Sequence, residues 1–370
     1  MRTSLRIVLP ITALALAACG QQPVKDAPGT ISVEASDNAC KVSRTSAPAG
    51  TITFDVRNTG SQVTEFYLYG QGDKIISEVE NIGPGTNRQL VAQVPQGGEY
   101  TTACKPGMQG NGIRGEFTVT GSAQAASSPE IARAVAAYKT YVDQQADQLR
   151  ADTGRFAQAV KTGDVAGAKA LYPRARTAWE RIEPVAESFG DLDPKIDGRE
   201  ADLDPGQPFT GYHRLEKDLW ATGPRPDTPA VADQLVADVD QIVARSRNVE
   251  LTPADIANGA KELLDEVATS KVTGEEETFS HTDLWDFQAN VEGAEQVVDV
   301  LRPVLAAKDP KLLGTLDQNF GTVNGLLARY RVGDGFRTYP ELRPEQVKEL
   351  SAAVDALAEP LSRTAAVVTA

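Results

Sequence analysis

Basic side chains are the scarce charged class in this sequence. Its 370 residues include 37 Lys and Arg against 51 Asp and Glu, so the formal net charge is -14 at pH 7. Removal of an N-terminal leader containing Arg2 and Arg6 would make the remaining chain more acidic still. Such a chain repels nucleic acid and anionic membrane surfaces and attracts cations. The composition therefore excludes nucleic-acid binding as the main function.

Histidine is rarer than any charged residue, since the chain contains only His213 and His281. A zinc peptidase of the His-Glu-x-x-His type needs two imidazoles on one helix, and the inverted motif needs a histidine directly after the glutamate. Lys217 follows Glu216 here, so neither motif is present. Any metal site built on His213 must add carboxylates, a donor set that suits iron, manganese or zinc better than cuprous copper.

Long apolar runs are also missing, apart from one near the N-terminus. Arg2 and Arg6 precede the run 7–18, which is too short to span a bilayer as a permanent helix, so residues 1–18 are predicted to be a signal peptide. The sequence Leu16-Ala-Ala-Cys19-Gly resembles the lipobox of bacterial lipoproteins. This resemblance implies cleavage before Cys19, lipidation of that cysteine, and a polar tether over 19–29. We therefore expect an extracytoplasmic protein held at the membrane by a lipid anchor.

Residues 30–121 have the pattern of a β-sandwich. Short alternating or β-branched segments are separated by turn sequences such as Pro48-Ala-Gly50 and Gly83-Pro-Gly85. Strands at this spacing predict an all-β, antiparallel sandwich. The expected strands are Ile31–Glu34, Thr51–Val56, Glu65–Tyr69, Gln89–Val94 and Gly115–Thr120.

The end of this region, Tyr100–Met108, resembles the metal loop of a cupredoxin. A blue-copper centre needs two histidines, a cysteine and a weak axial ligand, and no histidine precedes His213. The resemblance therefore implies the fold more than the copper site. Two alternatives stay open for the remaining cysteines. Cys40, Glu65, Cys104 and Met108 could hold copper or a second iron, or Cys40 and Cys104 could form a disulfide, which an oxidising compartment favours.

The pattern changes after an Ala- and Ser-rich linker at 122–128. Apolar residues then recur at helical spacing, and breaks such as Thr252-Pro253 and Asp309-Pro310 mark helix boundaries. Residues 129–370 are predicted to form an all-α bundle. After a first helix beginning near Pro129, the expected helices are Val165–Phe189, Phe209–Thr222, Ala230–Val249, Pro253–Ser270, Thr282–Ala307, Lys311–Tyr330 and Pro344–Val368.

His213 and Glu216 are separated by three residues, so a helix projects both side chains from one face, where they can bind one cation. Glu180 and Glu183 repeat this spacing upstream, and the acidic loop 190–198 leads the chain back toward His213 and contributes Asp197. The alternative is an acidic face that is merely solvated. Asp283 and Asp286, which follow His281, could also face the bundle interior and add to the site.

The motif Gly211-x-His213-x-x-Glu216 is similar to the GxHxxE signature of the imelysin family. Together with a lipoprotein leader and a cupredoxin-like domain, it resembles the EfeO-type iron uptake components. This resemblance implies a non-catalytic protein that binds ferric or ferrous iron through His213, Glu216, Glu180, Glu183 and Asp197. It also implies two partners, an inner-membrane iron permease and a haem-containing peroxidase. Imelysin-type domains have been classed with metallopeptidases, so a metal-dependent peptidase is the alternative function.

Overall fold

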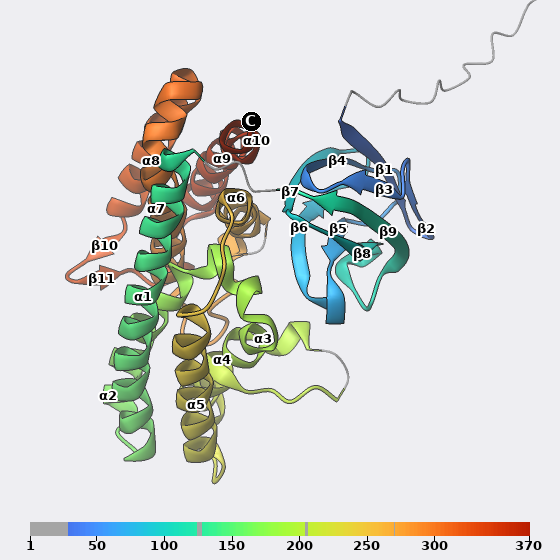
Figure 1. Ribbon diagram of the computed structural model, residues 1–370. Coiled ribbons are helices and arrows are strands. Elements are labelled where there is room, and N and C mark those ends of the chain that lie inside the picture. Colours follow the sequence, from blue (N-terminus) through green and yellow to red (C-terminus); the bar gives the residue numbers. More distant parts are fainter. Residues whose placement is uncertain (1–28, 124–127, 204–205, 270) are drawn as a thin grey trace, which may run out of the picture.

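The computed structural model describes residues 29–123, 128–203, 206–269 and 271–370 (Figure 1). The predicted signal peptide 1–18, the lipidation site Cys19 and nearly all of the tether 19–29 lie outside the described residues. The first strand begins at Thr30, the last strand of the β-domain ends at Ser122, and the first helix begins at Pro129. A β-domain is therefore followed by a largely helical domain, which confirms the predicted fold class.

The β-domain consists of two packed sheets. One has the strand order β2-β1-β4-β7 and the other β3-β9-β8-β5-β6. The pairs β1–β4 and β3–β9 are parallel, so the expectation of a purely antiparallel sandwich was wrong. The chain leaves β1, pairs back as β2, crosses to the other sheet as β3, and returns beside β1 in the same direction. The strands are β1 (Thr30–Ser36), β2 (Ala39–Val42), β3 (Ser46–Pro48), β4 (Gly50–Asn58), β5 (Thr64–Tyr69), β6 (Ile75–Ile82), β7 (Asn87–Val94), β8 (Gln96–Cys104) and β9 (Ile113–Ser122).

Side-chain alternation decides what each strand of this domain presents to the core. Ile31, Val33 and Ala35 of β1 are buried between the sheets, as period-two alternation requires. On β5, Phe66 faces the same core and pairs in register with Cys104 of β8. Glu65, one residue earlier, consequently points to the opposite face of its sheet. That outer face lies toward the helical domain.

The helical domain is built on long antiparallel helices that pack against one another. The predicted helix 165–189 is shorter than expected: α2 ends at Glu180, because Pro184 has no N–H to donate to the Glu180 carbonyl. The α-helices are α1 (Pro129–Lys161), α2 (Val165–Glu180), α3 (Asp193–Asp197), α4 (Gly211–Lys217), α5 (Thr228–Ser246), α6 (Pro253–Thr269), α7 (Asp283–Lys308), α8 (Pro310–Ala328), α9 (Pro344–Leu361) and α10 (Thr364–Thr369).

Shorter elements connect these helices. A run of 3-10 turns, η3 (Glu183–Leu192), follows α2, and a π-helical turn, η5 (Asp218–Thr222), extends α4. Another 3-10 turn, η6 (Lys271–Thr273), lies between α6 and α7. A two-stranded hairpin, β10 (Arg331–Val332) with β11 (Gly335–Phe336), lies between α8 and α9 and is the one β element of this domain within the described residues.

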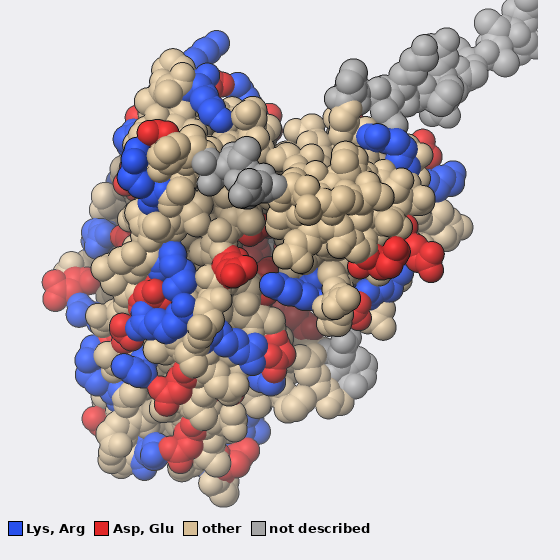
Figure 2. Space-filling model, in the orientation of Figure 1, with Lys and Arg blue, Asp and Glu red and all other residues tan. Residues whose placement is uncertain are grey.

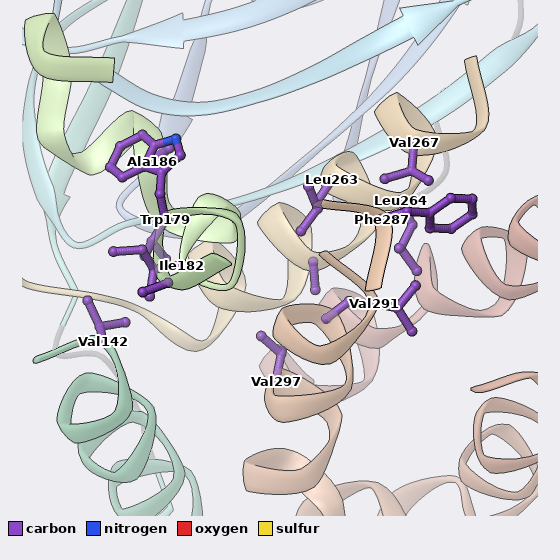
Figure 3. Packing of buried hydrophobic residues seen from close by; sticks show 14 of the residues in the cluster. Val142, Trp179, Ile182, Ala186, Leu263, Leu264, Val267, Phe287, Val291 and Val297 are labelled. Atoms are coloured by element: carbon purple, nitrogen blue, oxygen red, sulfur yellow. The ribbon is translucent and has the colours of Figure 1, made fainter. Parts of the chain in front are cut away.

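Apolar stripes of the helices meet in one continuous core. Figure 3 shows apolar side chains of α6 and α7 meeting in this core, among them Leu264, Phe287 and Val291. Each of these three side chains is almost completely buried. Side-chain caps fix several helix starts, since Ser128, Asp164 and Asp309 accept backbone N–H groups at the first turns of α1, α2 and α8. The core therefore supports the rigid walls of the site described below.

The two domains pack against each other through α6. Asn258 of α6 donates one hydrogen bond to the carbonyl oxygen of Val91, 2.8 Å away, and another to the Ser77 hydroxyl, 3.3 Å away. On another side, α6 closely approaches η3 at Gly259, where an added Cβ would lie 1.7 Å from the Pro184 carbonyl oxygen. Among the described helices, none is both long enough and apolar enough to cross a membrane.

Candidate metal centre in the helical domain

The centre begins with the helix start at Gly211. This residue has φ +77°, and a Cβ atom there would lie 2.1 Å from the carbonyl oxygen of Ile196. Only glycine tolerates both the left-handed backbone and this approach. The close approach packs the start of α4 against the end of α3, the helix that carries Asp197. The glycine of the motif therefore brings the His213 helix and the Asp197 helix together.

His213 lies in the interior of the bundle with only 2 % of its surface exposed. Its Nδ1 is 3.4 Å from Oε2 of Glu216, the partner expected from their spacing on the helix. Its Nε2 is 3.4 Å from Oδ1 of Asp197 and 3.5 Å from Oε1 of Glu276. The structure therefore brings three of the five predicted ligands together, namely His213, Glu216 and Asp197, and adds Glu276.

Arg176 of α2 lies among these groups and is completely buried. Its Nη1 is 3.3 Å from Nε2 of His213, and its Nε is 2.6 Å from Glu277 and 3.3 Å from Asp286. The guanidinium thus supplies the positive charge that stabilises the cluster in the metal-free chain. The carboxylates that form ion pairs with Arg176 are Glu180, Asp197, Glu276, Glu277 and Asp286.

Glu180 and Glu183 do share a cation, but that cation is the ammonium group of Lys271. The Lys271 Nζ is 3.2 Å from Glu180 and 2.7 Å from Glu183, and the Asn290 amide also donates to both carboxylates. Glu180 is fully buried beside Arg176, which also contacts His213. Both predicted ligands therefore lie in the polar interior of the bundle, where their shared partner is Lys271 and not the imidazole.

Glu276 and Glu277 were missed by the sequence interpretation. They belong to the run Glu275-Glu276-Glu277 before α7, and both are buried. The Tyr172 hydroxyl donates to Glu277 over 3.2 Å and the Ser280 hydroxyl donates over 2.8 Å. The one signal in the sequence was three consecutive acids four residues before the second histidine. A charge run is more often a solvated surface, and only the fold turns this one inward.

Two overlapping groups in this centre have the geometry to hold a metal ion. One consists of Asp197, His213 and Glu276, and the other of His213, Glu216 and Glu277; in each, the ligand atoms lie within 4.8 Å of one another. The first group uses Nε2 and the second uses Nδ1, so the imidazole has a candidate position on each side. Oxygen ligands with a single imidazole form a hard site suited to iron or manganese.

The charges of the centre alter its titration. Burial alone raises the pKa of Glu276, but Lys271, His213 and Arg176 hold that pKa well below its usual range. Burial and Arg176 lower the pKa of His213, yet hydrogen bonds to Asp197, Glu216 and Glu276 raise it well above the ordinary value. In the metal-free chain the surrounding acids therefore favour the charged form of the imidazole.

Glu216 is held firmly in place. One of its oxygens accepts the backbone N–H groups of Phe279 and Ser280, at 2.9 and 2.6 Å. His281 follows directly, is exposed, and takes a left-handed backbone with φ 59°. The second histidine therefore lies outside the centre, while the loop before it positions Glu216. Of the two aspartates after His281, Asp286 faces the centre and contacts Arg176.

The second candidate site, in the β-domain, has a different arrangement from the one that was considered. Cys40 and Cys104 are joined by a disulfide, one of the two alternatives left open by the sequence. Glu65 points to the other face of the sheet, where its carboxylate accepts a hydrogen bond of 2.9 Å from the Tyr67 hydroxyl. Met108 is 42 % exposed. The four residues therefore do not converge on one point in this structure.

Comparison with known proteins gives the same division of the chain. The imelysin family model, also designated peptidase M75, matches residues 134–364, and the cupredoxin-like domain model matches residues 7–119. Three proteins called "Iron uptake system component EfeO", from Escherichia coli O157:H7, Escherichia coli K12 and Shigella flexneri, are each 40 % identical over 339 residues. In each case the match covers 90 % of both chains. The chain belongs to the EfeO-type family of iron uptake components.

One solved structure is also similar to part of the chain. It is the crystal structure of dithionite-reduced auracyanin from Roseiflexus castenholzii, which is 22 % identical, covers 26 % of this chain and 100 % of its own, and has a TM-score of 0.22. At that score it adds nothing to the fold assignment. The assignment of an EfeO-type component with a cupredoxin-like and an imelysin domain follows from the relatives and the family models, and it confirms the predicted family.

Proposed function

We propose that this protein binds iron at the His213 centre outside the cytoplasm and passes it to a membrane permease. The observation that carries the proposal is the convergence of one imidazole with Asp197, Glu216, Glu276 and Glu277 inside a rigid helical core. One oxygen of Asp286, Oδ2, is also buried there and has no hydrogen-bond partner among the described residues. An unpaired buried carboxylate oxygen is costly unless a cation or proton joins it.

The proposed role in uptake also includes the lipid anchor and the two membrane-associated partners that were predicted from the sequence. Lipidation of Cys19 would hold the chain at the membrane, near an inner-membrane iron permease and a haem-containing peroxidase. Glu180 and Glu183 would not bind the ion directly. They would help to position Lys271 and Arg176, which lie beside the ligands. The disulfide between Cys40 and Cys104 supports a location outside the cytoplasm, because such bonds persist in oxidising compartments.

Metal titration of matched variants tests this proposal. The mature chain is stripped of metal and titrated anaerobically with ferrous iron, and bound iron is measured by elemental analysis. We expect His213→Ala and Glu216→Ala each to lose the ion of the helical domain. His281→Ala is the matched control, because this exposed histidine lies outside the centre, and it should bind as the wild type does. Unchanged binding by His213→Ala would rule out the proposed centre.

A peptidase is the second candidate, because the matching family model carries that designation. Two observations favour a binding protein. His213 is 2 % exposed, which leaves no room for a polypeptide beside it. Glu216, the candidate general base, already accepts two backbone N–H groups. Casein cleavage by the metal-loaded wild type, lost in Glu216→Ala, would favour the peptidase; we expect no cleavage.

A further inference from the structure

A cavity of about 660 Å³ lies between the β-domain and the helical domain. Figure 2 shows acidic side chains recessed in the cleft where the two domains meet. Five of the described acidic residues line the cavity, so its carboxylates come from both domains: Glu78 of β6, Glu187 of η3, Glu250 before α6, and Asp255 and Glu262 of α6. Glu187 is exposed at the mouth, Glu262 is half-buried, and Glu78 is only 5 % exposed. The exposure of these three carboxylates therefore decreases from the mouth of the cavity to its interior.

Glu78 is the residue that points to a ligand. Its Oε2 atom is buried and has no hydrogen-bond partner among the described residues, although its side chain lines the cavity. Within proteins, a buried carboxylate oxygen is normally satisfied by a donor, a proton or a cation. The Glu187 carboxyl interacts directly with Glu78 across the domain boundary. Two carboxyl groups in hydrogen-bond contact hold either a shared proton or, when both are ionised, a shared cation.

The basic groups that line the cavity do not neutralise these acids. Arg245 is engaged elsewhere, with the carbonyl oxygen of Phe189 at 2.5 Å and with Asp191 at 2.8 Å. Burial raises the pKa of Glu78 well above its usual value, and the neighbouring Glu187 carboxylate raises it further. Burial likewise raises the pKa of Glu262 to about 8. Lys105 lowers the pKa of Glu187 and Lys261 lowers that of Glu262, but burial and the neighbouring acids outweigh both lysines.

A line of acidic residues connects the cleft with the His213 centre. Asp193, at the start of α3, interacts electrostatically with Glu187 on the side of the cleft and with Asp197 on the side of the centre. Asp197 in turn lies 3.4 Å from the imidazole of His213. Asp193 is therefore coupled electrostatically to acids of both the cleft and the centre. The buried centre needs an entrance, because His213 itself is 2 % exposed.

We propose that Glu78 and Glu187, which contact each other, form with Glu262 of the same cleft wall a second site, for a hard metal cation such as iron, which receives the ion between the domains before it reaches His213. An all-carboxylate donor set suits hard cations that prefer oxygen ligands. Binding there would also hold the two domains together, since the ligands come from both. The site stands on the cleft geometry alone; the onward transfer rests on the function proposed for the His213 centre.

Counting bound ions tests the site. The metal-free mature chain is loaded anaerobically with ferrous iron, desalted and analysed for iron. We expect two ions in the wild type, one in the double variant Glu78→Gln/Glu262→Gln, one in His213→Ala, and none when all three substitutions are combined. Glu99→Gln/Glu116→Gln removes the same charge from exposed positions of the β-domain and should retain two ions.

The counts separate failure of this site from failure of the His213 centre. Two ions retained by Glu78→Gln/Glu262→Gln, or one ion in the wild type that His213→Ala abolishes, would overturn the cleft site. One ion lost by Glu78→Gln/Glu262→Gln with none lost by His213→Ala would support the cleft site and reject the centre. Circular dichroism of each variant, matching that of the wild type, establishes that lost ions do not reflect unfolding.

The order of binding has its own measurement. Trp179 donates a hydrogen bond of 3.0 Å to Asp197, so in a Trp220→Phe/Trp285→Phe background quenching of the remaining tryptophan fluorescence by iron reports filling of the His213 centre. If the cleft receives the ion first, Glu78→Gln/Glu262→Gln should slow this quenching about 10-fold, within the range by which local charge alters association rates. The Glu99→Gln/Glu116→Gln control should quench at the wild-type rate. Equal rates in both double variants would overturn the entry role.

Discussion

The carboxylates around His213 and the carboxylates in the interdomain cleft differ in what balances their charge. Around His213, Arg176 and Lys271 reach into the cluster, and the pKa of Glu276 falls well below normal despite burial. In the cleft, burial and mutual repulsion prevail, and the pKa of Glu78 rises well above normal. The pKa of the same residue type is therefore lowered in one place and raised in the other.

This difference shows two ways of preparing acids for a cation. The His213 centre is assembled in advance by internal cations, which an incoming metal ion has to displace or accommodate. Within the described part of the chain, Oε2 of Glu78 has no hydrogen-bond donor in the cleft, so the proposed ion would supply the missing charge. Each arrangement predicts a different response when a charge is removed, and the following substitutions separate them.

The largest expected effect is on the internal cation of the centre. Arg176→Met leaves five buried carboxylates without their shared guanidinium, so the free energy of unfolding should fall by about 3–5 kcal/mol. Urea denaturation of the metal-free protein measures it. Arg302→Met, which removes two exposed ion pairs with Asp299 and Asp317, is the control and should cost at most about 1 kcal/mol. Equal losses would show that Arg176 does not balance the cluster.

The disulfide of the β-domain should affect stability without affecting the metal. Cys40→Ala/Cys104→Ala opens a loop of 64 residues, which should lower the free energy of unfolding of the β-domain by about 4 kcal/mol. We expect the amount of bound iron to stay at the wild-type level, because the two sulfurs are bonded to each other. Thermal unfolding and elemental analysis of the same sample provide both readings. Loss of one bound iron ion in this variant would instead indicate that the cysteines are metal ligands.

Lys271→Met should strengthen metal binding at the centre. The ammonium group lies 4.0 Å from the proposed ligand Glu276 and repels an incoming cation, so its removal should raise the affinity about 10-fold, a typical coupling between neighbouring sites. Competition with a chelator measures the affinity. Lys348→Met removes the same charge from an exposed position and should leave the affinity unchanged. A weaker affinity in Lys271→Met would mean that the lysine organises the ligands more than it repels the ion.

The smallest expected effect is on the pH dependence of stability. Glu262 has a pKa of about 8 in the folded chain against an ordinary value of 4.5, so the folded state binds more protons between these values. The free energy of unfolding therefore falls as the pH rises from about 5 to 8. Glu262→Gln should make this fall shallower by on the order of 1 kcal/mol, since solvent in the cleft weakens the effect. Urea denaturation at several pH values, with Glu99→Gln as control, checks the slope.

Local pattern was enough to predict the two-domain fold and part of the centre. Helical spacing places His213 and Glu216 on one face, and the resemblance of the motif adds Asp197, which the structure brings to the imidazole. Period-two alternation likewise predicted the β-domain. These features depend on residues near one another in the sequence, or on a family motif that carries the long-range information with it.

The remaining features depend on contacts that local pattern does not contain. Arg176 reads as one arginine among many on an amphipathic helix, and Glu276 as part of a charged loop, until the fold buries both. The parallel pairing of β1 with β4 depends on how the chain crosses between sheets. Glu78 lies in a strand whose outer face reads as solvated, whereas α6 and η3 cover it. Burial by a distant element turned ordinary surface residues into functional candidates.

Helix α6 has a mechanical consequence. It touches the β-domain at Asn258, contributes Glu262 to the cleft, and ends at Thr269, two positions before Lys271. A rod anchored in this way acts as a lever, because a tilt of the β-domain against the bundle would shift the lysine that Glu180 and Glu183 grip. A partner that docks onto the β-domain could thereby change the affinity of the His213 centre for its ion without contacting any of the ligands.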